Sequence, residues 1–369
     1  VPIHALHYRF NRMSVLDEIT GEQRHKSHII HYAGSNDLEA LYHGIAADKA
    51  KWERKEPALT HILIECTGGI GDVVYAEPII RYMIETKYKG RDDVRFTIST
   101  QRPRIFAHFD YPNVEVVSGE IKIDDTRENP VCVKQIHPLQ NHATRVFNPY
   151  QATHNLDFQA NALLSDYMPP EAKTVRLKTT WEDGLEFALM GEVLQSFNII
   201  IHCGCGWPSK TFPLDYWQRI VDGIAAKNSH VALFGQNINA LQGVLPVKCP
   251  WNVFDLRGKL SLGGMFALIE DSNKLLTNES APLCIAGAFD NHIYLIANPK
   301  APELVFPYRH GSTAYKTHAI RGPMLSSQLM GILPNCPHRS TIADLPPGHT
   351  IEEFLPSIET VIREVLKPC

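Results

Sequence analysis

The chain has 369 residues, of which 44% are hydrophobic and 21% are charged, and its formal net charge is −4. This length allows two domains of ordinary size, and the weakly acidic balance excludes a strongly basic, generic nucleic-acid binder. No apolar run reaches the roughly 18 residues that a membrane span needs. Peripheral contact with a membrane surface stays open, and the cysteine pattern described next favours a cytoplasmic protein.

The eight cysteines include no CxxC pair, a pattern that favours reduced thiols over a disulfide scaffold or a zinc site. Among the eighteen histidines, His25, His28 and His31 have the spacing closest to that of metal ligands. Their neighbours are β-prone, and on a strand a spacing of three residues turns successive rings to opposite faces. We therefore expect no metal site there.

Residues 1–60 are predicted to form an N-terminal extension. Two β-prone runs flank a polar turn at Gly21 and indicate a hairpin. A helix follows, with Asn36 as its cap and Glu39 three residues later.

From residue 61 onward, apolar runs alternate with amphipathic stretches. In the first half we expect strands at residues 61–66, 95–100 and 114–117, a helix at 76–88, and a loop-rich polar stretch at 124–150. In the second half we expect strands at 198–203, 230–235, 274–278 and 292–298, and helices at 214–227, 261–271, 282–289 and 351–366. Strands that alternate with helices indicate an α/β fold with parallel sheets and right-handed crossovers.

This rhythm restarts near residue 198, after a Pro-Pro pair at 169–170 and a polar helix near 181–190. We therefore expect a first domain at residues 61–180 and a second domain at 181–345. A C-terminal helical segment, residues 346–369, is expected to pack back on the first domain.

A glycine-rich turn, residues 67–71, follows the first strand. Its glycines allow close approach to a ligand, but Val74 stands where a dinucleotide fingerprint needs its third glycine. Asp72 lies next to this turn, near the start of a helix that would keep its pKa low. Its carboxylate either acts as a base on an acceptor hydroxyl or only caps the helix, and this segment alone favours neither.

The second segment, residues 199–213, runs from a buried strand through a loop into a helix. The loop amides and the hydroxyls of Ser209 and Thr211 can donate to phosphate oxygens, and Lys210 supplies positive charge. It is not a Walker motif, and the alternative is a lysine that faces solvent on an ordinary loop.

The third segment, residues 274–286, passes directly from a strand into a helix with Pro282 in its first turn. The free amides around Glu279, Ser280 and Ala281 form an anion site, although every α/β protein contains junctions of this kind.

In order and spacing, these segments resemble those of the heptosyltransferase-like inverting glycosyltransferases, the family that builds the inner core of lipopolysaccharide. That family has a G-D-V-x4-P segment, as at residues 71–78, and a W-P-S-K-x-[WF]-P segment, as at 207–213. It also has a D-L-x-G-x-x-[ST]-L segment, as at 255–262, and an N-D-[ST]-G-x-x-H segment, which residues 278–284 match in part. The resemblance covers about residues 61–299.

The resemblance implies a GT-B architecture, in which two Rossmann-like domains face each other across a cleft. The first domain would hold the acceptor, with Gly69 and Gly71 in the acceptor loop and Asp72 as the catalytic base. The second would hold a nucleotide-sugar donor, and transfer would invert the sugar without a metal or another cofactor. The implied diphosphate-binding residues are Ser209, Lys210, Thr211, Glu279, Ser280 and Ala281, and those on the nucleoside side are Gly235 and Asn239.

Four positions depart from the family pattern. Glu279 and Cys284 stand where the family has Asp and His, Ala281 replaces a Gly, and Asn239 replaces a Glu on the nucleoside side. The identities of the nucleotide and of the sugar are therefore not carried over from the family.

The acceptor that the family implies is a bacterial glycan such as lipopolysaccharide core. A hydroxymethylated base in DNA is an alternative, since basic clusters at residues 24–28 and 102–104 could contact phosphates. A protein acceptor, a non-catalytic nucleotide-sugar binder and a GT-B-like epimerase also stay open.

Overall fold

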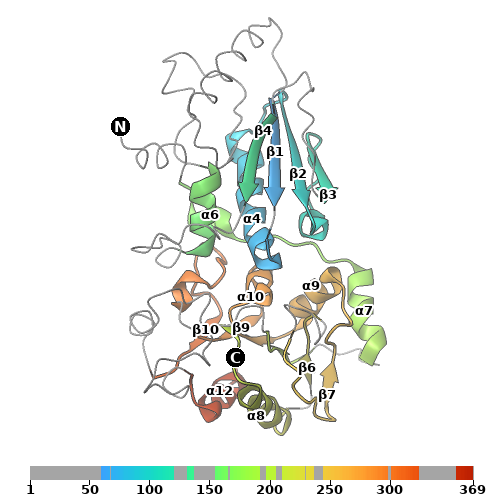
Figure 1. The fold of residues 1–369 in the computed structure, drawn as a ribbon, viewed down its shortest axis with the longest axis vertical. Helices are drawn as coiled ribbons and strands as arrows, with labels where there is room; N and C mark the ends of the chain where they lie inside the picture. Colours follow the sequence, from blue (N-terminus) through green and yellow to red (C-terminus); the bar gives the residue numbers. More distant parts are fainter. Residues whose placement is uncertain are drawn as a thin grey trace, which may run out of the picture.

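The computed structural model describes residues 60–66, 68–119, 131–136, 154–164, 167–191, 197–204, 210–228, 230–236, 244–297, 301–323 and 355–368. These residues form two separate parallel sheets, one from each half of the sequence, and the N-terminal end of α4, which runs along the first sheet, meets α10 between the two halves (Figure 1). The predicted N-terminal extension lies outside the described residues, except that Thr60 begins the first strand.

The first sheet has four strands in the order β3-β2-β1-β4. They are β1 (Thr60–Cys66), β2 (Val94–Thr100), β3 (Val114–Ser118) and β4 (Val131–Ile136). Because β2 and β3 lie on one side of β1 and β4 on the other, the strand order reverses beside β1. Open α/β sheets bind ligands at the carboxyl ends of the strands at such a switch point, and here that point is the end of β1, next to the glycine turn.

Helical segments flank this sheet. They are α4 (Ile70–Tyr82), which continues into the π-helical turn η1 (Met83–Lys87), the 3₁₀ turn η2 (Pro103–Phe106), α6 (Asn155–Leu164) and the 3₁₀ turn η3 (Pro170–Lys173).

Two predictions for the first half need correction. The stretch at residues 124–150 was predicted to be loop-rich, but it contains β4, whose β-branched Val131, Val133 and Ile136 favour a strand despite their polar surroundings. The helix predicted to start at residue 76 starts at Ile70, so Asp72 lies in its first turn. The early turns are poor in helix formers and are stabilised by burial, which sequence propensity does not report.

The second sheet has six strands in the order β10-β9-β8-β5-β6-β7. They are β5 (Ile199–His202), β6 (Val231–Leu233), β7 (Val253–Asp255), β8 (Lys274–Thr277), β9 (His292–Ile296) and β10 (Thr317–Ile320). β5 is buried throughout, as expected for a central parallel strand covered on both faces. The second switch point lies between β5 and β8, where His202 pairs in register with Thr277.

The helices of this half agree with the prediction to within a few residues at α8 and α9. They are α7 (Trp181–Gly191), α8 (Leu214–Ala225), α9 (Leu262–Asp271), α10 (Ala281–Ile285), the 3₁₀ turns η5 (Ala286–Ala288) and η6 (Pro302–Leu304), and α12 (Ile358–Leu366). The helix expected at residues 282–289 is shorter and ends in η5.

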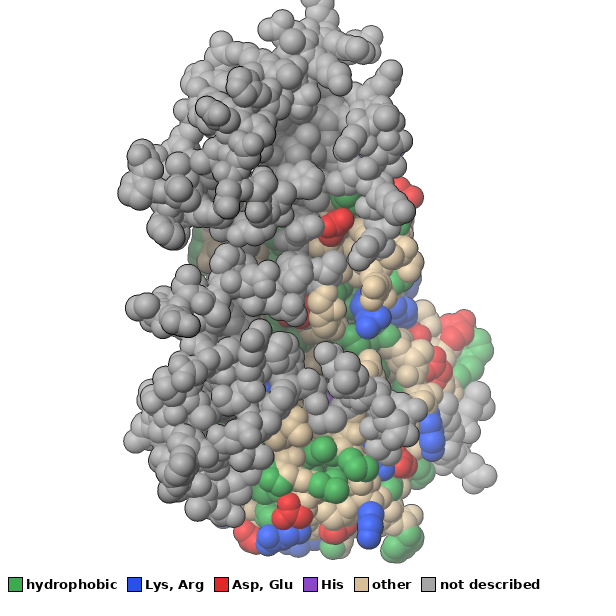
Figure 2. Space-filling view, in the orientation of Figure 1, with side chains coloured by type: hydrophobic (Ala, Val, Ile, Leu, Met, Phe, Trp, Pro, Cys, Tyr) green, Lys and Arg blue, Asp and Glu red, His purple; other side chains and the backbone are tan. Residues whose placement is uncertain are grey.

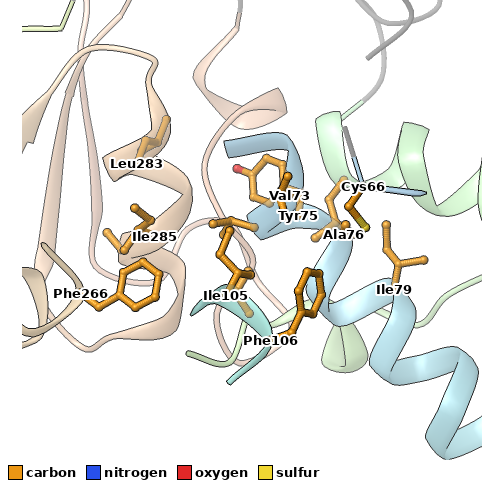
Figure 3. Packing of buried hydrophobic residues seen from close by; sticks show 14 of the residues in the cluster. Cys66, Val73, Tyr75, Ala76, Ile79, Ile105, Phe106, Phe266, Leu283 and Ile285 are labelled. Carbon is orange, nitrogen blue, oxygen red and sulfur yellow. The ribbon is translucent and has the colours of Figure 1, made fainter. Parts of the chain in front are cut away.

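One of the two hydrophobic core clusters extends across both halves. Figure 3 shows this cluster continuing from Ile79 of α4 through Ile105 to Phe266 and Ile285 of the second half. The N-terminal turns of α4 pack against α10. The two helices, and with them the two switch points, therefore lie next to each other.

Helix α7 forms a second joint between the halves. It packs so closely on α9 that a Cβ added at Gly264 would lie 2.1 Å from Glu186 Oε2. Glu186 accepts hydrogen bonds from the backbone N–H of Ser261 at 2.8 Å and from its hydroxyl at 2.6 Å. Asp183 forms an ion pair with Arg104 of η2. Helix α7 thereby ties the first half to α9.

The prediction that the C-terminal helix packs on the first domain is wrong, because α12 packs on α8 and β10 of the second half. Its Val361 and Val365 are fully buried in the core around α8. Ile362 fills the space above Gly223 of α8, and Lys274 Nζ donates to the Val365 carbonyl at 2.8 Å. The apolar face of α12 is therefore buried by the nearest amphipathic helix of its own half.

We predict that Gly223→Ala does not give the stabilisation expected of a glycine-to-alanine change inside a helix, which is about 0.5–1 kcal/mol. The new Cβ would lie 2.2 Å from Cδ1 of Ile362, whereas a Cβ at Gly184 of α7 would meet nothing within 4 Å. Urea denaturation should show a gain for the control Gly184→Ala and none for Gly223→Ala. Adding Ile362→Ala to Gly223→Ala should relieve the clash. An equal gain at both glycines would contradict the packing of α12 on α8.

Candidate active site

The two switch points meet where the first turn of α4 lies on α10. A Cβ added at Gly71 would lie 3.1 Å from Cys284 Sγ and 3.6 Å from the Cα of Ala281. The glycine turn that precedes α4 begins at Gly68, whose φ of +113° is a conformation that side chains disfavour. The predicted acceptor loop and the start of α10 are therefore in direct contact.

Asp72 lies in the first turn of α4 and is partly exposed. Its Oδ2 accepts a hydrogen bond from the backbone N–H of Gly69 at 3.0 Å, so the carboxylate does cap the helix. A carboxylate offers about four acceptor positions, so a capping bond does not by itself prevent a contact with a substrate hydroxyl. Capping and proton abstraction are therefore compatible functions of the same side chain.

Of the other acidic groups near α4, Glu77 is committed to structure. It is fully buried, and its Oε1 accepts from Arg81 at 2.8 Å and contacts His108 Nε2 at 3.0 Å. Its Oε2 accepts from the backbone N–H of Arg176 at 2.8 Å. These bonds join α4 to two other segments of the first half.

His154 and Asp157 are likewise engaged. The ring of His154 bonds the Phe306 carbonyl through Nε2 at 2.8 Å and accepts from the Leu156 N–H through Nδ1 at 3.1 Å. Asp157 pairs with Lys173 Nζ at 2.7 Å. Unlike these two side chains and Glu77, the Asp72 carboxylate follows directly on the glycine turn at the carboxyl end of β1.

On the opposite side, Lys210 is not a solvated surface lysine. Its Nζ lies 2.8 Å from Glu279 Oε1, and the two side chains are only 17% and 6% exposed. Glu279 therefore neutralises Lys210 when no anion is present. Thr211, the next residue, is partly buried at the start of the segment that leads into α8.

Ser280 lies at the base of the same site, before the first residue of α10, Ala281. Its hydroxyl oxygen is 3.1 Å from His202 Nδ1 and 3.1 Å from Thr277 Oγ1. Gly235, on the predicted nucleoside side, has a φ of +130°, and a Cβ there would lie 2.8 Å from Cδ2 of His202. Two other predicted donor-binding residues, Ser209 and Asn239, lie outside the described residues.

His202, which lies within the strand predicted at residues 198–203 and is the last residue of β5, is the buried centre of this region. Its ring lies among the residues that follow β5, β6 and β8, and burial lowers its pKa to about 4. The ring is therefore neutral at physiological pH. A lone histidine at the end of an apolar strand was the available signal, but its partners come from distant segments.

Cys284 stands beside the base candidate. Burial raises the pKa of its thiol to about 12, and the carboxylates of Asp72 and Glu279 act in the same direction, while the Lys210 ammonium opposes them. The thiol is therefore protonated and not a nucleophile. Asp72, Glu279 and Lys210 all lie within electrostatic range of one sulfur atom, although they come from the two halves of the chain.

Within the described ranges, no group of three or more His, Cys, Asp or Glu side chains is arranged to hold a metal ion. In that same part of the chain, no helix is long and apolar enough to cross a membrane.

The low pKa of His202 predicts a pH-dependent stability. Between the unfolded pKa of about 6.5 and the folded pKa of about 4, only the unfolded state binds the proton, so the free energy of unfolding falls as pH falls through this range. The loss amounts to about 3 kcal/mol, at about 1.4 kcal/mol per pH unit. His202→Gln should flatten this part of the stability curve, while His230→Gln, a change at an exposed ring, should not. Identical slopes for His202→Gln and the parent would contradict the assignment.

Comparison with known proteins identifies the family. The model of glycosyltransferase family 9 (heptosyltransferase) matches residues 133–326, a range that contains Lys210 and Glu279 but not Asp72. No curated protein matches the chain by sequence.

Solved structures that share the fold include the following two. The family 9 glycosyltransferase of Veillonella parvula DSM 2008 has 13% identity and a TM-score of 0.50, with 85% of this chain and 99% of that chain covered. The ADP-heptose lipopolysaccharide heptosyltransferase II of E. coli has 15% identity and a TM-score of 0.50, with 74% and 95% covered. At these identities the likeness shows the two-domain GT-B fold alone. Because the family model spans just over half of the chain, the protein belongs to glycosyltransferase family 9, the heptosyltransferase family, and is a glycosyltransferase.

Proposed function

We propose that this enzyme transfers a sugar from a nucleotide-sugar donor to a hydroxyl group of a glycan, with inversion at the anomeric carbon and without a catalytic metal. The first domain, residues 61–180, would hold the acceptor and the second, residues 181–345, the donor. One observation carries the proposal: the first turn of α4, which carries the partly exposed carboxylate of Asp72, lies on α10, the helix that begins two residues after Glu279, the ion-pair partner of Lys210.

In the proposed reaction, Asp72 takes the proton of the acceptor hydroxyl as its oxygen attacks the anomeric carbon. The bond from that carbon to the diphosphate oxygen breaks, and the electron pair leaves with the nucleoside diphosphate. Negative charge therefore develops on the diphosphate, opposite the attacking oxygen. A positive charge already held at that place stabilises the transition state without reorganisation of solvent.

Lys210 is the group proposed to supply that charge. In the absence of donor its ammonium is neutralised by Glu279 at 2.8 Å, and a diphosphate would compete with that carboxylate for it. Ser280 and Ala281, beside this pair, complete the proposed diphosphate side, and Gly235 lies on the proposed nucleoside side. Ser209, Thr211 and Asn239 remain proposed members from the sequence pattern.

The acceptor is proposed to be a bacterial glycan such as lipopolysaccharide core. The E. coli structural relative is named for ADP-heptose and lipopolysaccharide, which makes ADP-heptose the first donor to test. A DNA acceptor has little support, because Lys and Arg side chains are mixed with Asp and Glu over the described part of the face in Figure 2. Cys66, Cys249 and Cys284 are free thiols, which supports a proposed location in the reducing cytoplasm.

We predict that Asp72→Asn lowers kcat by about 10²–10⁴, the usual contribution of a general base. Asn keeps an oxygen that can accept the Gly69 N–H, so the helix cap and folding should survive. Donor affinity should stay unchanged, because the proposed role of Asp72 is toward the acceptor hydroxyl. Asp215→Asn, an equivalent change in the first turn of α8, is the matched control and should leave kcat unchanged. Turnover of the Asp72 variant within about threefold of the parent would leave Asp72 as a cap only. Normal donor affinity together with no turnover by the parent on any glycan would instead indicate a non-catalytic binder.

We predict that Lys210→Ala weakens donor binding by about 1.5–3 kcal/mol, the range for a charge-assisted hydrogen bond. Isothermal titration calorimetry with ADP-heptose measures the change. Lys173→Ala is the control, because the Lys173 side chain is 8% exposed, against 17% for Lys210, and is paired with Asp157 at 2.7 Å but belongs to the first half. Both variants lose a buried ion pair, so both should be less stable, and only Lys210→Ala should lose donor affinity. Equal affinity in the two variants would remove Lys210 from the site.

A further inference from the structure

Asn278 connects the two ends of the chain segment that leads from β5 to α8. It is the first residue after β8, next to the register pair of His202 and Thr277, and it is 1% exposed. Its Nδ2 donates to the carbonyl of Gly204 at 2.8 Å and to the carbonyl of Lys210 at 2.5 Å. One buried amide group therefore sets the distance between two backbone positions on either side of residues 205–209.

This carboxamide has one orientation available to it. An amide NH₂ has two donors, and both are used on carbonyl oxygens, which an inverted carboxamide could not satisfy. The position is also crowded, since a Cβ added at Gly204 would lie 3.2 Å from Asn278 Oδ1 and 2.5 Å from Cε1 of His202. Asn278 is thus held by packing before any ligand arrives.

Glu279, the residue after Asn278, binds the ammonium group of the same lysine. Asn278 fixes the backbone carbonyl of Lys210, and Glu279 fixes its ammonium group. Two consecutive residues at the end of β8 therefore determine where the Lys210 side chain begins and where its charge lies. Without the hydrogen bond from Asn278, the backbone of Lys210 would no longer be held in place, even though Glu279 would still attract its ammonium group.

We propose that Asn278 is a positioning residue for diphosphate binding, which acts by fixing the backbone of Lys210 at the carboxyl end of β5. The inference rests on the proposed role of Lys210 in binding the donor diphosphate. Asn278 itself would not touch the donor, because its donor groups are used on the backbone.

The test is a double-mutant cycle of Asn278→Ala, Lys210→Ala and the combined variant. The ligands are inorganic pyrophosphate and whichever of ADP, GDP, UDP and CDP binds the parent protein most tightly, measured by calorimetry. Asn278→Ala should weaken binding about tenfold in the parent, the equivalent of about 1.4 kcal/mol, and less than about threefold when Lys210 is already Ala. The salt dependence of binding should fall in both variants, because Lys210→Ala removes the charge and Asn278→Ala leaves it no longer positioned at the diphosphate.

A matched control separates positioning from stability. Asn291 is 4% exposed, and its Nδ2 donates to the Ile269 carbonyl at 3.1 Å, away from the proposed site. Asn291→Ala should lower the melting temperature by a similar amount and leave ligand affinity and its salt dependence unchanged. If Asn278→Ala does not fold, Asn278→Ser, which removes the same amide with a smaller cavity, takes its place in the cycle.

The outcomes distinguish the two proposals. Absence of binding of every ligand to the parent would contradict the proposed donor class. Binding that Lys210→Ala weakens but Asn278→Ala does not, or an equal loss for Asn278→Ala in both backgrounds, would overturn the role of Asn278 and leave that of Lys210 intact.

Discussion

The contact between α4 and α10 is the constraint on which the geometry of the site depends. A Cβ at Gly71 would lie only 3.1 Å from Cys284 Sγ, so the first turn of α4 rests directly on α10. Both helices start at the carboxyl ends of parallel strands, and their packing therefore brings the two switch points face to face. Separating the two helices would expose apolar side chains of the shared core to water, at a free-energy cost of about 25 cal/mol per Å². It would also break the hydrogen bond from the Tyr75 hydroxyl to the Val305 carbonyl.

The second sheet buries a group of polar side chains next to the proposed donor site. His202, Thr277, Asn278 and Ser280 lie at the adjacent ends of β5 and β8 and hydrogen-bond to one another or to neighbouring carbonyls. Burying polar groups costs free energy that these bonds offset, and a bonded network admits fewer arrangements than an apolar cluster. These bonds support the Lys210–Glu279 pair, whose ammonium group is proposed to bind the donor diphosphate.

Much of the secondary structure could be predicted from local sequence patterns. The sequence predicted β1, β5 and α8, because the periodicity of their apolar residues is visible in a short window. β4 was not predicted, because its short apolar run lies in a polar stretch. The start of α4 was predicted six residues too late, because its first turn is stabilised by burial and not by helix propensity. The role of Asn278 was invisible, since its partners lie 68 and 74 residues away in sequence.

The sequence by itself therefore determined the α/β alternation and the family resemblance, and it singled out Asp72 and Lys210 as the residues of interest. These follow from spacing along the chain, which dictates which side chains share a face or a turn. Only the tertiary structure decided that Lys210 is paired with Glu279, that α12 packs on α8, and that position 71 touches position 284. Each of these contacts arises when separate elements bury their apolar faces together, and neither partner's local pattern specifies which surface it will meet.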